Sequence, residues 1–326
     1  MSPLLAVGIT LGAALLGAAL TAALIPRLER AQVLDVPNAR SLHAAPVPRG
    51  GGLAVALTVL PMQLALVATG RLALVPGLAL VITGAGFAAL GWADDRASRG
   101  VALRLALQML LATGFVTFAP AGDTGVMARA LLWLALLWQV NLFNFMDGAD
   151  GFAGTQALCA ALGLAVLLTL AGQPGAALAA CALAGAAAGF LRWNWHPARV
   201  FLGDVGSYFA GFQLGALAWW SSTGEATPWP ALVLLAPFVT DASLTLGARA
   251  LRGAPVWRAH REHAYQRLVL AGWSPARLAR ALGLLCVLLC WPAAALARGW
   301  PVTASVSAYG LLAIIWAWAR RSPPSS

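Results

Sequence analysis

The residues of this chain with the clearest capacity for chemistry lie in the stretch 141–151, NLFNFMDGADG. Two carboxamides and two carboxylates recur there at every third residue, directly after a run of Leu, Trp and Val; they are Asn141, Asn144, Asp147 and Asp150. Polar oxygen groups at the end of an apolar segment are costly unless something binds them. The stretch therefore predicts a site for a hard cation, a phosphate-bearing ligand, or both.

The type and spacing of these side chains narrow the chemistry. Steps of three residues keep neighbours adjacent on a helix but drift around its axis, so all four converge only if the helix breaks near Gly148 or Gly151. Amide and carboxylate oxygens together suit Mg²⁺, which takes few protein ligands and leaves phosphate oxygens and water to complete its shell. A polar helix end is the alternative interpretation, although it leaves most of these oxygens unexplained.

A second acidic feature is the adjacent pair Asp94 and Asp95 in the segment GWADDRASRG. Adjacent carboxylates repel each other unless a cation or a proton lies between them, which favours a divalent metal or a base with a raised pKa. The alternative is a solvated pair whose charge is offset by Arg96 and Arg99.

Two other segments carry groups suited to anions, flat rings or metals. In DVPNARSLHAAPVPRGGG, three cationic side chains could contact phosphate or anchor the chain at lipid headgroups; they are Arg40, His43 and Arg49. In RWNWHPARVFLGDVGS, which also holds Asn194, Phe201 could stack on a ring or lie at the membrane interface. Asp204 could hold a metal or cap the helix that follows.

The segment HREHAYQRL places His260, His263 and Arg267 at spacings that share one helical face. A single histidine is usually structural, but two histidines in an arginine-rich loop favour an anion site for diphosphate. A zinc site is disfavoured because no cysteine is near and only two imidazoles are present.

The elements that must position these groups are membrane helices. Of 326 residues, 60% are hydrophobic and 10% charged, and the mean hydropathy is +0.79, which is typical of a chain whose solvent is mostly lipid. Runs long enough to cross about 30 Å of hydrocarbon cover residues 3–26, 52–69, 72–92, 101–119, 127–146, 153–171, 174–192, 205–221, 228–248, 281–297 and 301–319. We expect an all-α, polytopic transmembrane bundle of eleven spans, one domain over residues 1–320, and a disordered tail at 321–326.

Charge sorting predicts the orientation. All 21 basic residues are arginines, and 18 of them fall in the alternate loops and span ends that follow the odd-numbered spans, including the C-terminal tail. By the positive-inside rule the N-terminus is outside and these loops are cytoplasmic, so the net charge of +10 reports topology rather than a nucleic-acid partner. The four cysteines lie inside apolar runs and read as core residues. Asp241 is the one carboxylate inside a span, so either it faces the bundle interior or the span boundary is wrong.

Five segments in order resemble the cytoplasmic loops of the bacterial polyprenyl-phosphate N-acetylhexosamine-1-phosphate transferases, glycosyltransferase family 4. They are DVPNARSLH, GWADDR, NLFNFMDGADGFAG, NWHPARVFLGDVGS and HREHAYQRL, and the likeness runs from about Asp35 to Gly272. It implies transfer of a sugar 1-phosphate from a UDP-N-acetylhexosamine to undecaprenyl phosphate at the cytoplasmic face of the bacterial inner membrane, with release of UMP. It also implies a Mg²⁺ cofactor, with Mn²⁺ as the alternative, and leaves a homodimer open.

The resemblance also implies roles for single residues. The expected catalytic groups are Asp94, Asp95, Asp147, His260 and His263; the expected substrate contacts are Arg40, His43, Asp150, Asn194, Phe201 and Arg267; the expected metal ligands are Asp204 and Asn144. Among these, the acidic pair matches groups assigned to metal binding or to deprotonating the lipid phosphate, and Asn194 and Phe201 match groups that grip uracil. Direct attack by the lipid phosphate and a covalent enzyme intermediate both remain open.

Two departures from the family pattern bear on the donor sugar. Ser41 stands where relatives carry Lys, which leaves Arg40 and His43 as the phosphate contacts of that loop. HREHAYQRL lacks the triple histidine of the muramoyl-pentapeptide enzymes, which favours the O-antigen branch with UDP-GlcNAc or a UDP-N-acetylated deoxyhexosamine as donor.

Two other classes of protein are weighed against this interpretation. A transporter of an anionic substrate would place ionisable groups near the membrane midplane, where only Asp241 qualifies. A CDP-alcohol phosphotransferase would carry an arginine soon after its Asp-Gly pair, and the segment Phe152-Ala153-Gly154 has none.

Overall fold

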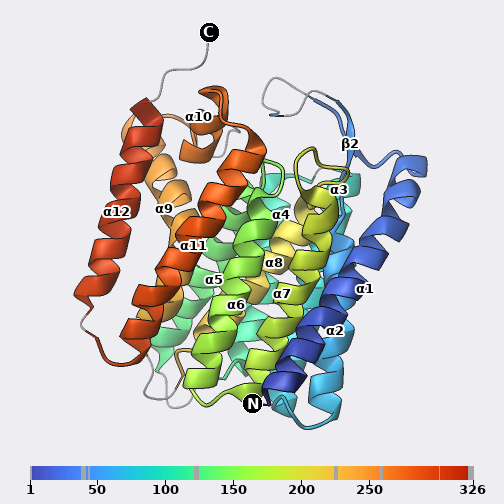
Figure 1. Ribbon diagram of the computed structural model, residues 1–326, viewed down its shortest axis with the longest axis vertical. Coiled ribbons are helices and arrows are strands. Elements are labelled where there is room, and N and C mark those ends of the chain that lie inside the picture. The colour runs from blue at the N-terminus through green and yellow to red at the C-terminus, as the bar shows by residue number, and fades with distance from the viewer. Residues whose placement is uncertain are drawn as a thin grey trace.

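The chain folds as a bundle of helices that alternate in direction (Figure 1). The structure is a computed structural model and describes residues 2–37, 42, 45–97, 99–120, 125–223, 227–256, 260–300 and 302–321. Its helices within these ranges are α1 (Pro3–Arg30), α2 (Gly52–Ala68), α3 (Leu74–Arg96), α4 (Val101–Phe118), α5 (Val126–Met146), α6 (Phe152–Leu170), α7 (Pro174–Asn194), α8 (Gly203–Trp220), α9 (Trp229–Leu251), α10 (Ala264–Leu270), α11 (Pro275–Ala297) and α12 (Thr303–Arg321). The strands β1 (Leu34–Asp35) and β2 (Val47–Pro48) pair antiparallel.

The predicted fold class is confirmed. Each of the eleven predicted spans corresponds to one long helix, and the largest difference is the start of α11, at Pro275 rather than residue 281. Eight of the described helices are long and apolar enough to cross a membrane, and α2 is a shorter apolar helix. The chain is therefore a polytopic, all-α membrane protein. The start of α1 and the end of α12 lie at opposite ends of the bundle, as an odd number of crossings requires (Figure 1).

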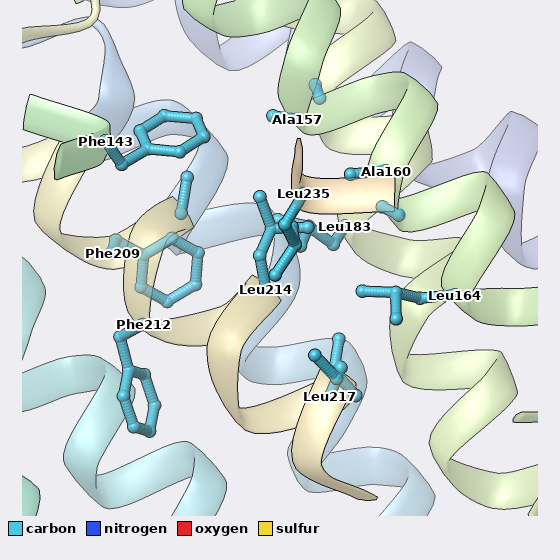
Figure 2. Close-up of a cluster of buried hydrophobic side chains, with 14 of the residues drawn as sticks. Phe143, Ala157, Ala160, Leu164, Leu183, Phe209, Phe212, Leu214, Leu217 and Leu235 are labelled. Carbon is cyan, nitrogen blue, oxygen red and sulfur yellow. The ribbon is translucent and has the colours of Figure 1, made fainter. Parts of the chain in front are cut away.

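The core forms around α7 and α8. Helix α7 consists largely of buried Ala and Gly, and such small side chains let α1 and α6 approach its backbone closely. Helix α8 is buried on nearly all sides, so its neighbours, rather than lipid, surround its polar residues. Leu183 of α7, Leu214 of α8 and Leu235 of α9 come together at the centre of the core (Figure 2).

Two short elements were not predicted, and both lie at the same end of the bundle (Figure 1). The β1–β2 hairpin pairs over two residues per strand, too few to leave an alternating pattern. Helix α10 has seven residues and sits above the ends of α9, α11 and α12. The predicted tail at 321–326 lies almost wholly outside the described residues.

Candidate active site

A polar recess of about 400 Å³ opens at the end of the bundle that carries the hairpin and α10. Segments far apart in the sequence meet there: β1, the residues after β2, the end of α3, the break between α5 and α6, the start of α8, and the start of α10. The residues lining it are Asp35, Leu42, Arg49, Asp95, Asn144, Asp147, Gly148, Ala149, Asp150, Asn194, Phe201, Gly203, Asp204, His260, Gln266 and Pro275. We call this cavity the polar recess.

Asp95 fixes the start of α8 at the floor of the polar recess. Its carboxylate is buried, with an exposed fraction of 3%, and accepts hydrogen bonds from the backbone amides of Asp204 and Val205, both at 3.0 Å. The first amides of a helix lack partners within the helix, so a carboxylate from α3 satisfies them. Gly203, with φ +74°, makes the turn that brings these amides to Asp95.

Asp94 points to a different neighbour and does not line the polar recess. Its oxygens accept hydrogen bonds from the backbone amide of Arg99 at 2.7 Å, from Arg104 Nη1 at 2.9 Å and from the Tyr208 hydroxyl at 3.2 Å. Of the two acids expected to hold a divalent metal or to act as a base, only Asp95 lines the polar recess, and the pair belongs to two separate hydrogen-bond networks. Successive helix residues are about 100° apart around the axis, which is why neighbours in sequence diverge in space.

Asn144 and Asp204, the two expected metal ligands, lie in direct hydrogen-bond contact. Asn144 Nδ2 donates to Asp204 Oδ1 at 2.6 Å and to Ser207 Oγ at 2.9 Å. Both side chains are half-buried and line the polar recess. The amide oxygen of Asn144 and the second oxygen of Asp204 remain on the same wall as further acceptors. Asn141 does not line the polar recess; its Nδ2 donates to Gln108 Oε1 at 2.7 Å.

Asp147 follows the last residue of α5, where the helix ends and the chain turns toward α6. No hydrogen bond from a described residue reaches its carboxylate. Burial raises the pKa of Asp147 well above its ordinary value, and repulsion by Asp204, Asp95 and Asp35 raises that pKa further. Carboxylates this crowded favour a cation or a proton among them, which is the electrostatic signature expected of a metal or phosphate-transfer site.

Asp150 and Asn194 tie the α5–α6 break to the segment between α7 and α8. Asp150 Oδ2 lies 2.7 Å from His196 Nδ1 and accepts a hydrogen bond from the Ala198 amide at 3.1 Å. Asn194 is 5% exposed; its Oδ1 accepts from the Gly151 amide at 3.0 Å and its Nδ2 donates to the Val200 carbonyl at 2.9 Å. Asn194 therefore lines the polar recess with a carboxamide already engaged by the backbone.

The β1–β2 hairpin and the residue after it also line the polar recess, through Asp35 and Arg49. Arg49 pairs with Asp95, its Nε lying 3.7 Å from Oδ1, and also donates to the Asp95 carbonyl. Phe201 lines the polar recess, and its backbone bonds to Pro48 and Gly51 dock the hairpin on the start of α8. The predicted phosphate contacts Arg40 and His43 lie outside the described residues.

The predicted cluster around α10 divides into three environments. His260 lines the polar recess, and burial, together with the positive charges of His263 and Arg249, lowers its pKa to about 4. His260 Nδ1 accepts from the Glu262 amide at 3.3 Å, so it is a neutral imidazole near neutral pH. His263 is buried, with an exposed fraction of 3%, and does not line the polar recess. Arg267 turns away from the polar recess to α12, where its Nη2 donates to the Arg320 carbonyl at 3.4 Å.

A second cavity of about 810 Å³ adjoins the polar recess and is mainly apolar. Side chains of α4, α5 and α9 form it, and it shares Asn144, His260 and Gln266 with the polar recess. Arg104, held by Asp94, and Tyr208 lie in its wall. We call it the apolar cavity. The charged polar recess and the apolar cavity therefore meet at the residues that they share.

The donor set fits a magnesium ion better than a metal held by protein alone. Among the described residues, no group of three or more His, Cys, Asp or Glu side chains is arranged as a metal cage. Mg²⁺ commonly binds through one or two carboxylates and takes its other ligands from phosphate and water. Asp204, Asn144 and Asp147 offer such a partial oxygen set on adjoining walls of the polar recess.

These features define the class of protein: an integral membrane protein with an acidic site beside an apolar cavity. Residues 77–222 match the sequence profile of glycosyl transferase family 4. The chain is 30% identical over 316 residues to the phospho-N-acetylmuramoyl-pentapeptide-transferase of Thermosynechococcus vestitus, covering 82% of this chain and 80% of that protein. It is 31% identical over 286 residues to the decaprenyl-phosphate N-acetylglucosaminephosphotransferase of Mycolicibacterium smegmatis, covering 74% of this chain and 70% of that protein.

A presumed glycosyltransferase of Streptomyces coelicolor is 36% identical over 258 residues, which cover 76% of this chain and 61% of that protein. The chain thus matches less than two thirds of the length of this relative. Together these likenesses place the chain in glycosyl transferase family 4, among the polyprenyl-phosphate hexosamine-1-phosphate transferases.

Several residues that build the site were not among the predicted site residues. Arg49 was noted as a cation, but its pairing with Asp95 depends on a hairpin that leaves no sequence signal. Arg104 lies within the apolar helix α4, nine residues after Asp95, and this position was the available hint. Gln266, which lines both cavities, is an ordinary residue type on a helix too short to show periodicity.

Proposed function

We propose that this protein transfers an N-acetylhexosamine 1-phosphate from a UDP-sugar to undecaprenyl phosphate. The single observation that carries the proposal is that the acidic polar recess and the apolar cavity share the residues Asn144, His260 and Gln266. A reaction between a soluble nucleotide sugar and a polyprenyl phosphate needs a polar site and a hydrocarbon site that meet at the reacting atoms. The name of the Mycolicibacterium relative, a decaprenyl-phosphate N-acetylglucosaminephosphotransferase, agrees with a polyprenyl-phosphate acceptor and an N-acetylhexosamine phosphate.

The chemistry is the exchange of one phosphorus–oxygen bond for another. An oxygen of the lipid phosphate forms a bond to the sugar-linked phosphorus, the bond from that phosphorus to the bridging oxygen breaks, and UMP leaves with that oxygen. Both reactants are anionic, so their approach requires positive charge and well-placed donors. Arg49 lines the polar recess and Arg104 lines the apolar cavity, so each cavity has an arginine among its described lining residues.

A bound Mg²⁺ would be held by Asp204 and Asn144, with Asp147 beside them, and would offset the charge of the diphosphate. Asp95 keeps the start of α8 in place and thereby aims Asp204 into the polar recess. Phe201 and Asn194 also line the polar recess, and a uracil ring would stack against the phenyl group of Phe201. His260 and Asp150 complete the rim with a neutral imidazole and a carboxylate.

Topology supports a cytoplasmic site in a bacterial inner membrane. The polar recess lies at the end of the bundle where arginine-rich segments end helices α1, α3, α7, α9 and α12. By the positive-inside rule this end is cytoplasmic, where UDP-sugars are present.

The donor we propose is UDP-GlcNAc or a UDP-N-acetylated deoxyhexosamine, and the product would initiate O-antigen or a related envelope glycan. The basis is HREHAYQRL, which holds His260 and His263 and lacks a third histidine. UDP-N-acetylmuramoyl-pentapeptide is the second candidate because the Thermosynechococcus relative, named a phospho-N-acetylmuramoyl-pentapeptide-transferase, matches 82% of the chain.

The test uses the purified protein in detergent with undecaprenyl phosphate and each labelled donor in turn, with UMP and lipid product measured separately. We expect UMP and a sugar-diphosphate lipid in equal amounts, dependent on Mg²⁺, with a UDP-N-acetylhexosamine but not with the muramoyl-pentapeptide donor. Asp204→Asn should lower turnover by more than about 100-fold, beyond the loss expected for an outer-shell group. No turnover with any donor would refute the function, and near-normal turnover of Asp204→Asn at low Mg²⁺ would remove Asp204 as the metal ligand.

A further inference from the structure

Asp241 is a buried carboxylate in the middle of α9 that lines neither the polar recess nor the apolar cavity. It is 7% exposed. Its Oδ1 accepts a hydrogen bond from the backbone amide of Ala264 at 2.9 Å, and its Oδ2 accepts one from the amide of Tyr265 at 3.1 Å. These amides belong to the first turn of α10 and have no partner within that helix. The carboxylate of Asp241 therefore holds the backbone of α10 against α9.

The same carboxylate contacts a predicted site residue. His263, the residue just before α10, has its Nδ1 3.4 Å from Asp241 Oδ1. The backbone amide of His263 in turn donates to Gln266 Oε1 at 3.3 Å. Gln266 and His260 line both the polar recess and the apolar cavity, so the placement of α10 determines where both side chains lie.

Tyr265 extends this connection to the acid-bearing segment after α5. Its ring stacks on Phe152 with centroids 4.9 Å apart, and its hydroxyl donates to the Phe145 carbonyl at 3.2 Å. Phe145 stands between Asn144 and Asp147, the two groups that face Asp204. The hydroxyl also occupies the space beside Gly148, where an added Cβ would lie 2.3 Å from it. Tyr265 thus fixes the segment from Asn144 to Gly148.

We propose that Asp241 is a positioning residue for sugar-phosphate transfer. It holds α10 so that His260 and Gln266 stand at the boundary of the two cavities and Tyr265 braces the segment that carries Asn144 and Asp147. Asp241 itself touches neither substrate. The kinetic part of this inference rests on the proposed function. The position of α10 can be measured without any turnover.

The two walls of the polar recess respond differently to loss of Asp241. Asn194, the last residue of α7, is held by hydrogen bonds to Gly151 and Val200, and the backbone of Phe201 is held by Pro48 and Gly51. The grip on the nucleotide should therefore survive, while the groups around the reacting phosphates become misplaced. This predicts a fall in kcat with little change in the KM for the UDP-sugar.

The experiment compares Asp241→Asn and Asp241→Leu with the wild-type protein in detergent. Asn keeps one acceptor oxygen and presents an NH₂ group to the second amide, whereas Leu removes both acceptors. We expect kcat to fall about tenfold for Asn and further for Leu, with the UDP-sugar KM changed less than about threefold. Hydrogen–deuterium exchange in residues 260–270 should speed up about tenfold or more in the same order, with α3 and α8 still protected.

Thr240→Val is the matched control. Thr240 is the neighbouring buried residue of α9, and its hydroxyl has no hydrogen-bond partner in the described part of the chain. The isosteric change should leave kcat and the exchange of α10 at wild-type values.

Two results would overturn the proposal. The first is unchanged exchange of residues 260–270 in Asp241→Leu, because the carboxylate would then not hold α10. The second is faster exchange across all helices in Asp241→Asn with a matching rise in KM, because Asp241 would then be a general folding residue. If the wild-type protein transfers no sugar phosphate, the proposed function fails, and the exchange data alone decide whether Asp241 positions α10.

Discussion

The contact between Gly148 and the Tyr265 hydroxyl provides a quantitative test of how α10 supports the site. An ideal Cβ on Gly148 would lie 2.3 Å from that hydroxyl, 0.7 Å short of the 3.0 Å that real Cβ contacts keep. The next nearest atom is Tyr265 Cζ, at 3.3 Å. The φ of Gly148 is not in the left-handed region, so alanine meets a steric obstacle here and no backbone one.

These distances set the expected energies of three variants. Gly148→Ala forces the hydroxyl away and should cost about 1–3 kcal/mol of stability, the usual range for overpacking. Tyr265→Phe loses the hydrogen bond to the Phe145 carbonyl and should cost about 1 kcal/mol. In the double variant the clashing atom is gone and the remaining contact is tight but tolerable. It should cost about 1 kcal/mol, so the two changes are non-additive by about 1–3 kcal/mol in the restoring direction.

The assay measures thermal unfolding and sugar-phosphate transfer for both single variants and the double variant. Gly148→Ala should lower transfer roughly tenfold because the clash displaces the segment that carries Asn144 and Asp147, and a rise of about 1.4 kcal/mol in the activation barrier corresponds to that factor; the double variant should recover most of that loss. A double variant as impaired as the sum of the single variants would show that Tyr265 does not brace this segment, and the account of α10 would fail with it.

Three further predictions concern other parts of the site. Asp94→Asn should raise the KM for undecaprenyl phosphate about five- to tenfold by loosening Arg104, with the UDP-sugar KM unchanged, and the reverse pattern would contradict the assignment of the apolar cavity to the acceptor. Gly91→Ala should destabilise the protein by about 2–3 kcal/mol, because its Cβ would lie 2.2 Å from the Asp204 carbonyl; Gly114→Ala, with no atom within 4 Å, is the control for helix propensity. Because the pKa of His260 is lowered from 6.5 to about 4, the unfolded chain binds one more proton between these pH values. The melting temperature should therefore fall as the pH drops through this window, and less so in His260→Gln.

The helices of the bundle were predictable because length and hydropathy alone define a membrane span. The range predicted at 72–92 and the helix Leu74–Arg96 differ by only a few residues, as do most other pairs. What could not be predicted are the elements outside the hydrocarbon, where burial and hydrogen bonds between distant segments replace periodicity. The β1–β2 hairpin docks on residues 201 and 202 through backbone hydrogen bonds, which leave no trace in side-chain types.

The sequence indicated which residues line the polar recess better than it indicated the contacts between their side chains. Asp204 and Asn144 lie in direct hydrogen-bond contact, and their expected role as metal ligands stays a prediction. Arg267 was expected to contact substrate because it shares a helical face with the histidines, yet α10 is oriented so that the arginine faces α12. The orientation of a seven-residue helix is set by its anchor on α9, and that anchor, Asp241, is 22 residues earlier than His263 in the chain.

Asp95 and Asp241 show why acidic residues inside apolar helices need not be catalytic to be tied to catalysis. Each lies on a membrane helix, and each accepts two backbone amides from the first turn of another helix, α8 for Asp95 and α10 for Asp241. A buried carboxylate is costly unless such donors satisfy it, and a buried helix start is costly unless an acceptor satisfies it. Each pair therefore removes two penalties at once and fixes the end of a helix beside the polar recess. Substituting such an acid should lower activity by moving the site, so the loss of turnover alone cannot assign it a chemical role, and the position of the capped helix has to be measured as well.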